Sequence, residues 1–281
     1  MALKIYKFST VGTNLLDIKR HYDDEGFAVV EVFNRNEMDY IRSMVRTLVS
    51  EPELKNPRIR RYAALTEADP DRFPDNPFAT YNVVNTPLAG DSWMSLLAED
   101  RILTLVSSVL ASDINFDMGF LRLRPPGLKI NHAWHRDCEA DAYTSQKAIT
   151  ALIYLSDMTA ENGATKVLPK SHLGIVGTDV SSFPIDDHVA ENEGLVVEVP
   201  AGCVLLLHGM AVHRGGWSST QESTGAALFE YKSADTYRRS DGDNFDLALC
   251  DLPLVRGSWR FRTNQDFSTL SKSQSLRSLS N

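Results

Sequence analysis

The chain has 281 residues, of which 43% are hydrophobic and 23% charged, proportions typical of one large globular domain. Its formal net charge of −8 disfavours a nucleic-acid partner, because a phosphate backbone requires a basic binding face. The three cysteines show no paired spacing, the first residues lack the apolar core of a signal peptide, and no apolar run is long enough to span a membrane. These features predict a cytoplasmic protein without a membrane partner.

The first part of the chain is predicted to be mostly helical. A short helix is expected over Leu15–Tyr22, followed by a strand over Phe27–Phe33. Apolar residues recur at helical spacing over Asn36–Val49, which predicts an amphipathic helix, and a second long helix is expected over Trp93–Leu110. Residues 51–90 hold six of the twelve prolines, so a long loop is expected there, either a substrate-facing lid or a surface excursion.

From Phe116 onward the pattern changes to short strands separated by turns. This pattern predicts a mainly β fold, a double-stranded β-helix (jelly-roll or cupin-like) core with flanking N-terminal helices. Ser181–Gly194 is expected to be an acidic connection between strands. We expect a single domain over 1–281, with helical support over about 13–112, the jelly-roll core over about 113–235, and a C-terminal extension and flexible tail over 236–281.

The most informative residues are His135 and Asp137, which form an H-x-D pair. Alternate residues of a strand point to the same side, about 6–7 Å apart, so this pair can face one metal ion. His213 follows the buried-looking strand of residues 202–207 and can supply a third ligand. Two imidazoles and a carboxylate suit Fe(II) and leave three metal positions open. The alternative is a surface ion pair beside an ordinary half-buried histidine, because an isolated H-x-D is common by chance.

The surroundings of the pair carry a more specific pattern. An apolar run over Ala148–Leu155 leads into D-x-T-x-E-N-G-A-x-x-V-x-P-x-S-H over residues 157–172. The pattern G-x-V-x-x-x-H-x-x-x-x-H follows over residues 202–213. In this order and spacing the chain resembles the phytanoyl-CoA dioxygenase family of Fe(II)/2-oxoglutarate oxygenases. The resemblance runs from about Phe116 to Tyr237, with an N-terminal extension from about Asp17.

The resemblance implies that His135, Asp137 and His213 hold Fe(II) and that 2-oxoglutarate and O2 are cosubstrates. The reaction would release succinate and CO2 and oxidise, most simply hydroxylate, a small polar metabolite or a natural-product intermediate. Halogenating relatives replace the ligand carboxylate with a small residue, so Asp137 favours hydroxylation, desaturation or ring chemistry. His172 and His208 are expected to be structural.

One position departs from the family pattern. The family usually carries an arginine eleven residues after the distal histidine, where it pairs with the far carboxylate of 2-oxoglutarate, and Thr224 stands there instead. Burying a carboxylate without a partner costs several kcal/mol, so another base is expected. If the alternate residues from Phe116 to Phe120 point inward, Arg122 and Arg124 point the same way, toward the metal. Alternatively, both arginines emerge into solvent.

Further site residues are predicted with less support. The other candidates for binding 2-oxoglutarate are Lys147, Thr150, Arg214 and Thr224. The candidates for facing the substrate are Arg61, Tyr62, His132 and Trp217. Two other classes of protein stay open. The same three ligands suit Zn(II) in a metal-dependent hydrolase, and the missing arginine leaves room for a non-catalytic relative that binds a metabolite.

Overall fold

The computed structural model describes residues 2–8, 15–51, 53–63, 80–110, 113–124, 132–138, 147–173, 184–234, 236 and 254–256. The helices are α1 (Leu15–Glu25), α2 (Arg35–Ser50), α3 (Asp91–Leu97), α4 (Asp100–Val109) and α5 (Asp187–Glu193), with the 3-10 turn η1 (Thr86–Ala89). The strands are β1 (Ile5–Lys7), β2 (Phe27–Glu31), β3 (Arg60–Ala63), β4 (Thr80–Val84), β5 (Ile114–Arg124), β6 (Ala148–Tyr154), β7 (Thr165–Val167), β8 (Leu195–Val196), β9 (Cys203–His208), β10 (His213–Gly215), β11 (Thr224–Ser233) and β12 (Leu254–Arg256).

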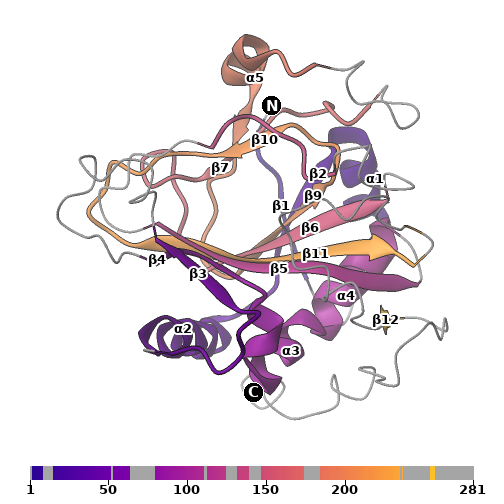
Figure 1. Ribbon diagram of the computed structural model, residues 1–281. Coiled ribbons are helices and arrows are strands. Elements are labelled where there is room, and N and C mark those ends of the chain that lie inside the picture. The colour runs from indigo at the N-terminus through magenta and orange to yellow at the C-terminus, as the bar shows by residue number, and fades with distance from the viewer. Residues whose placement is uncertain are drawn as a thin grey trace.

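Within these ranges the strands form two sheets (Figure 1). The larger sheet has the order β1-β2-β9-β6-β11-β5-β4-β3, with β12 also beside β5, and the smaller sheet has the order β10-β7-β8. Strands β1 and β2 run parallel, and the other described ladders are antiparallel. Two packed, mainly antiparallel sheets are the arrangement that the strand pattern predicts for the second half of the chain.

Both faces of the larger sheet are covered, which explains why its central strands are almost entirely apolar. On β9, Val204 and Leu206 belong to the core that includes the helices, whereas Leu205 and Leu207 belong to a second core with residues of the smaller sheet. Figure 1 shows α2, α3 and α4 on the side of the larger sheet away from β7 and β10. Alternate residues of each central strand therefore enter two different cores.

Two predicted helices agree with the structure, and a third differs. A capping box begins α2, in which the Asn34 side chain accepts from the Glu37 N–H and the Glu37 carboxylate accepts from the Asn34 N–H. The single long helix expected over Trp93–Leu110 is wrong, because α3 ends at Leu97 and α4 starts at Asp100. Glu99 lies between them with an extended backbone, and its side chain accepts from the Arg101 N–H. No described helix is long and apolar enough to cross a membrane.

The expectation of an unstructured loop over residues 51–90 is wrong in the described parts. Strands β3 and β4 extend the larger sheet, and Val84 of β4 lies opposite Phe120 of β5. Pairing with a strand distant in sequence overrides the local signal of the prolines. Residues 64–79 of the expected lid lie outside the described residues, as does most of the C-terminal extension and tail.

The acidic connection expected over Ser181–Gly194 also contains regular structure. Its second half forms helix α5, which begins where the Asp186 side chain accepts hydrogen bonds from the N–H groups of His188 and Val189. An aspartate in the N-cap position satisfies amide groups that have no partner within the helix. The connection therefore presents a short helix beside the smaller sheet.

A buried ion pair joins β5 and β11. Lys232 Nζ lies 2.8 Å from Asp117 Oδ1, and the two side chains are 8% and 2% exposed. We expect Lys232→Met to lower the free energy of unfolding by about 3–5 kcal/mol, because the Asp117 carboxylate stays buried without this ammonium group. Urea unfolding measures the change. Lys7→Met, which removes the exposed pair with Glu31, is the control and should cost less than about 1 kcal/mol. Equal small losses would contradict the prediction.

Candidate metal site

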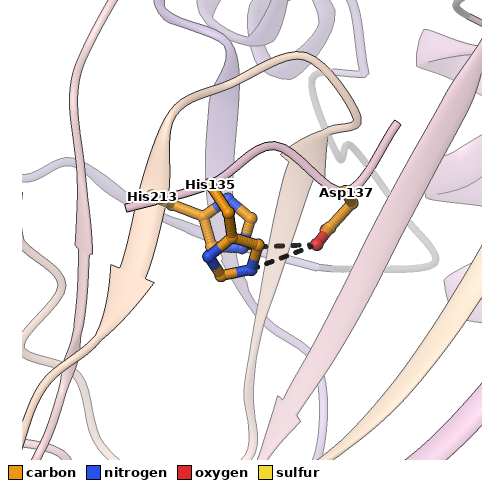
Figure 2. Close-up of side chains that lie close together, drawn as sticks. All are labelled: His135, Asp137 and His213. Atoms are coloured by element: carbon orange, nitrogen blue, oxygen red, sulfur yellow. Dashed lines mark ion pairs between the residues drawn. The ribbon is translucent and has the colours of Figure 1, made fainter. Parts of the chain in front are cut away.

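A backbone bridge brings the two histidines of the predicted triad together. His135 and His213 pair in antiparallel fashion, and the N–H of each donates to the carbonyl of the other at 3.0 Å. Directly opposed residues of an antiparallel pair project to the same side. The imidazole centres consequently lie 4.3 Å apart. Figure 2 shows both rings facing Asp137, which follows His135 by two residues.

The three candidate ligands converge on one point. Asp137 Oδ1 lies 3.6 Å from His135 Nε2 and 3.5 Å from His213 Nε2. One ligand atom from each residue lies within 4.8 Å of the other two. In the part of the chain that the structure describes, this is the one group of three or more His, Cys, Asp or Glu side chains with such geometry.

Hydrogen bonds orient both imidazoles for metal binding. His135 Nδ1 lies 2.8 Å from the Ala133 carbonyl, and His213 Nδ1 lies 3.0 Å from the Ala211 carbonyl. Each Nδ1–H can only donate to its carbonyl, so the lone pair of each neutral ring is on Nε2. Burial lowers the pKa of His213, which favours the neutral form. Both lone pairs therefore face the Asp137 carboxylate.

Thr150 holds the carboxylate of the triad. Its hydroxyl donates to Asp137 Oδ2 at 2.5 Å, which leaves Oδ1 toward the histidines. Thr150 is thus placed to orient a ligand rather than to bind 2-oxoglutarate directly. Two neutral imidazole nitrogens and one oriented carboxylate oxygen form the donor set that suits Fe(II) with three open positions. The residues fit the metal that the motif predicts.

We expect Thr150→Val to weaken metal binding about tenfold, because hydrogen-bonded partners of metal ligands typically contribute 10–100-fold to affinity. Valine has a similar shape but cannot donate to Asp137 Oδ2. Titration of the metal-free protein with Co(II) measures the affinity. Thr47→Val, at an exposed position on α2, is the matched control. Identical affinities for the two variants would exclude a role for the Thr150 hydroxyl.

Arg122 and Arg124 point between the two sheets. They lie opposite Ala226 and Thr224 of β11, and Ala226 belongs to the core between the sheets. Phe116, which simple alternation groups with the arginines, instead packs in the core beside the helices. The register between β5 and β11 shifts between Glu230 and Tyr231. Because of this irregularity, Phe116 lies on the opposite face of β5 from the one that simple alternation predicts.

Arg124 occupies a space made by two glycines. Its side chain is buried, with 5% exposure. A Cβ atom at Gly163 would lie 2.9 Å from Arg124 Cδ, and one at Gly215 would collide with Arg124 Nη2. Sequence reasoning missed this role of the glycines, although both stand in the recognisable N-G-A and H-R-G-G runs. The guanidinium therefore reaches from β5 across to β10, two residues beyond His213.

The Thr224 side chain already has a hydrogen-bond partner in the protein. Its hydroxyl donates to the Asn162 carbonyl at 3.1 Å, so its proton is already used. Arg124 lies directly opposite Thr224 in the ladder between β5 and β11. An arginine therefore stands beside the position at which the family pattern has one, on the neighbouring strand.

His132 lies between the arginines and the histidine pair. Arg122 Nη1 donates to His132 Nε2 at 3.3 Å, and the His132 ring centre lies 6.4 Å from that of His135. Burial, followed by the charges of Arg122 and Arg124, lowers the pKa of His132 to about 3. The imidazole is neutral at physiological pH and accepts the hydrogen bond from Arg122.

The structure does not bring two further cosubstrate candidates to this side. Arg214 directly follows His213 and points the other way, where its Nη2 lies 2.8 Å from Glu191 Oε2. Lys147 is exposed just before β6. Alternation along a strand explains Arg214, because neighbours of an inward-facing ligand must face outward.

The substrate-facing candidates are likewise spread apart. Arg61 lies opposite Val83, a residue of the core beside the helices, and donates to the Leu48 carbonyl at 2.7 Å. Trp217 is 44% exposed just after β10. Tyr62 pairs with Asn82 through its backbone, and its side chain lies outside the described residues. Of the three candidates whose side chains the structure describes, His132 is the one that lies beside the triad.

Comparison with known proteins decides the family. The family described as Phytanoyl-CoA dioxygenase (PhyH) matches residues 22–224, which is more than half of the chain. The chain belongs to the phytanoyl-CoA dioxygenase family. The resemblance predicted from the motifs is thereby confirmed. The enzyme class and cofactors predicted with it, a dioxygenase with Fe(II), 2-oxoglutarate and O2, are confirmed at the level of this family.

Individual relatives are more distant. A probable alpha-ketoglutarate-dependent hypophosphite dioxygenase of Stutzerimonas stutzeri is 26% identical over 167 residues, which cover 55% of this chain and 58% of that protein. The chain thus spans less than two thirds of the length of this curated relative. Among solved structures, the non-heme alpha ketoglutarate dependent epimerase SnoN from nogalamycin biosynthesis has a TM-score of 0.64 at 22% identity, covering 89% of this chain and 93% of that one.

The carbocyclase SnoK from the same biosynthesis has a TM-score of 0.66 at 17% identity, covering 90% of this chain and 94% of its own. At such identities these likenesses establish the fold alone. They confirm the jelly-roll class predicted from the strand pattern.

Proposed function

We propose that this chain is a non-haem Fe(II)/2-oxoglutarate-dependent dioxygenase that hydroxylates a small polar metabolite or natural-product intermediate and releases succinate and CO2. The observation that carries the proposal is the convergence of His135, Asp137 and His213 in a member of this family. The carboxylate ligand supports hydroxylation over halogenation, which requires a small residue in its place. SnoN and SnoK, from one biosynthetic route, support the choice of a natural-product intermediate.

The roles of the ligands follow from their geometry. His135 and His213 would hold Fe(II) through Nε2, and Asp137 would hold it through Oδ1, the oxygen nearest both rings. Thr150 would keep the other carboxylate oxygen turned away. When bound, Fe(II) supplies the activation of O2 with 2-oxoglutarate, while the protein supplies orientation and exclusion of water.

Arg124 is our choice for the anchor of 2-oxoglutarate. Its buried guanidinium lies between the sheets beside Gly215, on the side of the bridge that carries the histidine ligands. A guanidinium binds a carboxylate through two parallel hydrogen bonds, which sets both position and orientation. Arg122, which contacts His132, is the second candidate.

We assign the cytoplasm as the compartment of the protein. Cys203 is a buried free thiol, which supports a reducing environment. The net charge of −8 supports a small-molecule substrate over a nucleic acid.

The test is turnover of 2-oxoglutarate by the purified protein. With Fe(II) under air, we expect release of succinate and CO2 even without the correct substrate, and faster release when that substrate is supplied. Metal-dependent binding of 2-oxoglutarate without turnover would favour a non-catalytic relative. Hydrolysis supported by Zn(II), with no binding of 2-oxoglutarate, would favour a hydrolase. If the protein showed no turnover and no metal-dependent binding of 2-oxoglutarate, the proposal would be refuted.

A further inference from the structure

The outer side of the histidine bridge carries its own cluster of side chains. Because His135 and His213 are directly paired, the neighbouring residues Trp134 and Arg214 face each other on the opposite side of the bridge. The Arg214 guanidinium carbon lies 5.0 Å from the centre of a Trp134 ring. The two residues that adjoin the ligands in sequence thus stack on each other, facing away from the metal.

Helix α5 packs on this outer surface. Trp134, Ala190 of α5 and Val212 are buried together in one small apolar cluster. Gly194, directly after α5, is so close that a Cβ atom there would lie 2.9 Å from the Trp134 ring. Figure 1 shows α5 beyond the smaller sheet, near β7 and β10. Helix α5 therefore covers residues that flank both histidine ligands.

Glu191 of α5 contacts three other segments of the chain. Its Oε2 lies 2.8 Å from Arg214 Nη2, and its Oε1 lies 3.0 Å from Lys166 Nζ. Lys166 Nζ also donates to the Glu191 carbonyl at 2.5 Å. Hydrogen bonding from Lys166, together with Arg214 and Trp134, lowers the pKa of the Glu191 carboxyl. One carboxylate thus links α5 to β7, to β10 and to the segment that carries His135.

We propose that Glu191 is a positioning residue of the iron site. By tying Trp134, Arg214 and Lys166 into one unit, it keeps the His135 and His213 backbones paired and their imidazoles directed at one metal ion. Groups that orient ligands from outside the coordination sphere typically contribute 10–100-fold to metal affinity. The inference rests on the proposed metal site.

If Glu191 only stabilised the fold, its loss would lower the melting temperature. The Glu191 side chain is 48% exposed, and ion pairs at that exposure contribute little to the stability of a fold. Its loss should therefore leave the melting temperature nearly unchanged. The geometry of the two ligands is more sensitive, because a metal site depends on the orientation of each imidazole.

The experiment compares Glu191→Gln with Glu193→Gln, a matched variant at an exposed position on the same helix. Each metal-free protein is titrated with Co(II), and the ligand-field absorption of the complex is recorded. We expect Glu191→Gln to bind Co(II) about tenfold more weakly, with an altered absorption spectrum and a similar melting temperature. Glu193→Gln should match the wild type. In the metal-free proteins, amide hydrogen exchange over residues 132–138 and 213–215 should be faster in Glu191→Gln alone.

A second variant removes the ion pair between Glu191 and Arg214 by changing Arg214. Arg214→Met should weaken Co(II) binding to a similar extent, and the double variant should be little worse than either single variant, because both remove one interaction. Additive effects, or wild-type affinity and exchange in Glu191→Gln, would overturn the role of Glu191 while leaving the metal site intact. A wild-type protein that bound no Co(II) would overturn the metal site and this inference together.

Discussion

His213→Ala is expected to abolish both Co(II) binding and turnover of 2-oxoglutarate. The substitution leaves one imidazole and one carboxylate, too few to hold a metal ion on one face. The loss in affinity should exceed the roughly 10–100-fold that removal of a hydrogen-bonded partner of a ligand costs. Titration of the metal-free protein with Co(II), followed by an assay of succinate release with Fe(II), measures both effects.

His188→Ala is the matched control for this prediction. His188 is an exposed histidine on α5 whose ring contacts Asn192. Its loss should change neither metal affinity nor turnover. Retention of tight metal binding in His213→Ala would show that the metal is held elsewhere and would remove the basis of the proposed function.

Arg124→Met is expected to raise the KM for 2-oxoglutarate about 100-fold. Removing one partner of a buried, hydrogen-bonded charge pair costs roughly 2–5 kcal/mol, and each 1.4 kcal/mol corresponds to a factor of about ten. Methionine keeps the apolar part of the side chain between the sheets. Because the metal ligands are untouched, Co(II) affinity should stay unchanged. Steady-state assays across a range of 2-oxoglutarate concentrations measure the effect.

The same assay on Arg122→Met separates the two arginines. We expect a smaller rise in KM, because Arg122 contacts His132 instead of lying beside Thr224. Arg20→Met, which removes an exposed arginine of α1, should leave KM unchanged. A large effect in Arg122→Met alone would move the anchor to that residue, and no effect in either variant would exclude both arginines.

The proposed anchor shows how a ligand contact can move between strands. Directly opposed residues of an antiparallel pair have Cβ atoms about 5 Å apart, less than the length of an arginine side chain. A guanidinium attached at Arg124 of β5 can therefore reach the region served by one attached at the position of Thr224 on β11. The alternation of the strand indicated this possibility, whereas the pairing of Arg124 with Thr224 became visible only from the register of the two strands.

Several features of the chain could be obtained from its order of residues. The triad followed from a short local motif and the spacing of the family pattern, and α2 followed from apolar residues at helical intervals. Such signals are local, because they depend on side chains a few positions apart. They identified His135, Asp137 and His213 without any knowledge of how the strands pair.

Other features depend on partners that are distant in sequence. Strand β4 pairs with β5, and β3 pairs with β4 in turn. The irregular pairing of β5 with β11 turns Phe116 toward the helices. The contacts of Glu191 with Lys166 and Arg214 join three separate segments, so the sequence shows at that position just one acidic residue among others. Periodicity specifies which face of an element is apolar, but packing of the whole chain selects which elements meet and which polar groups find partners.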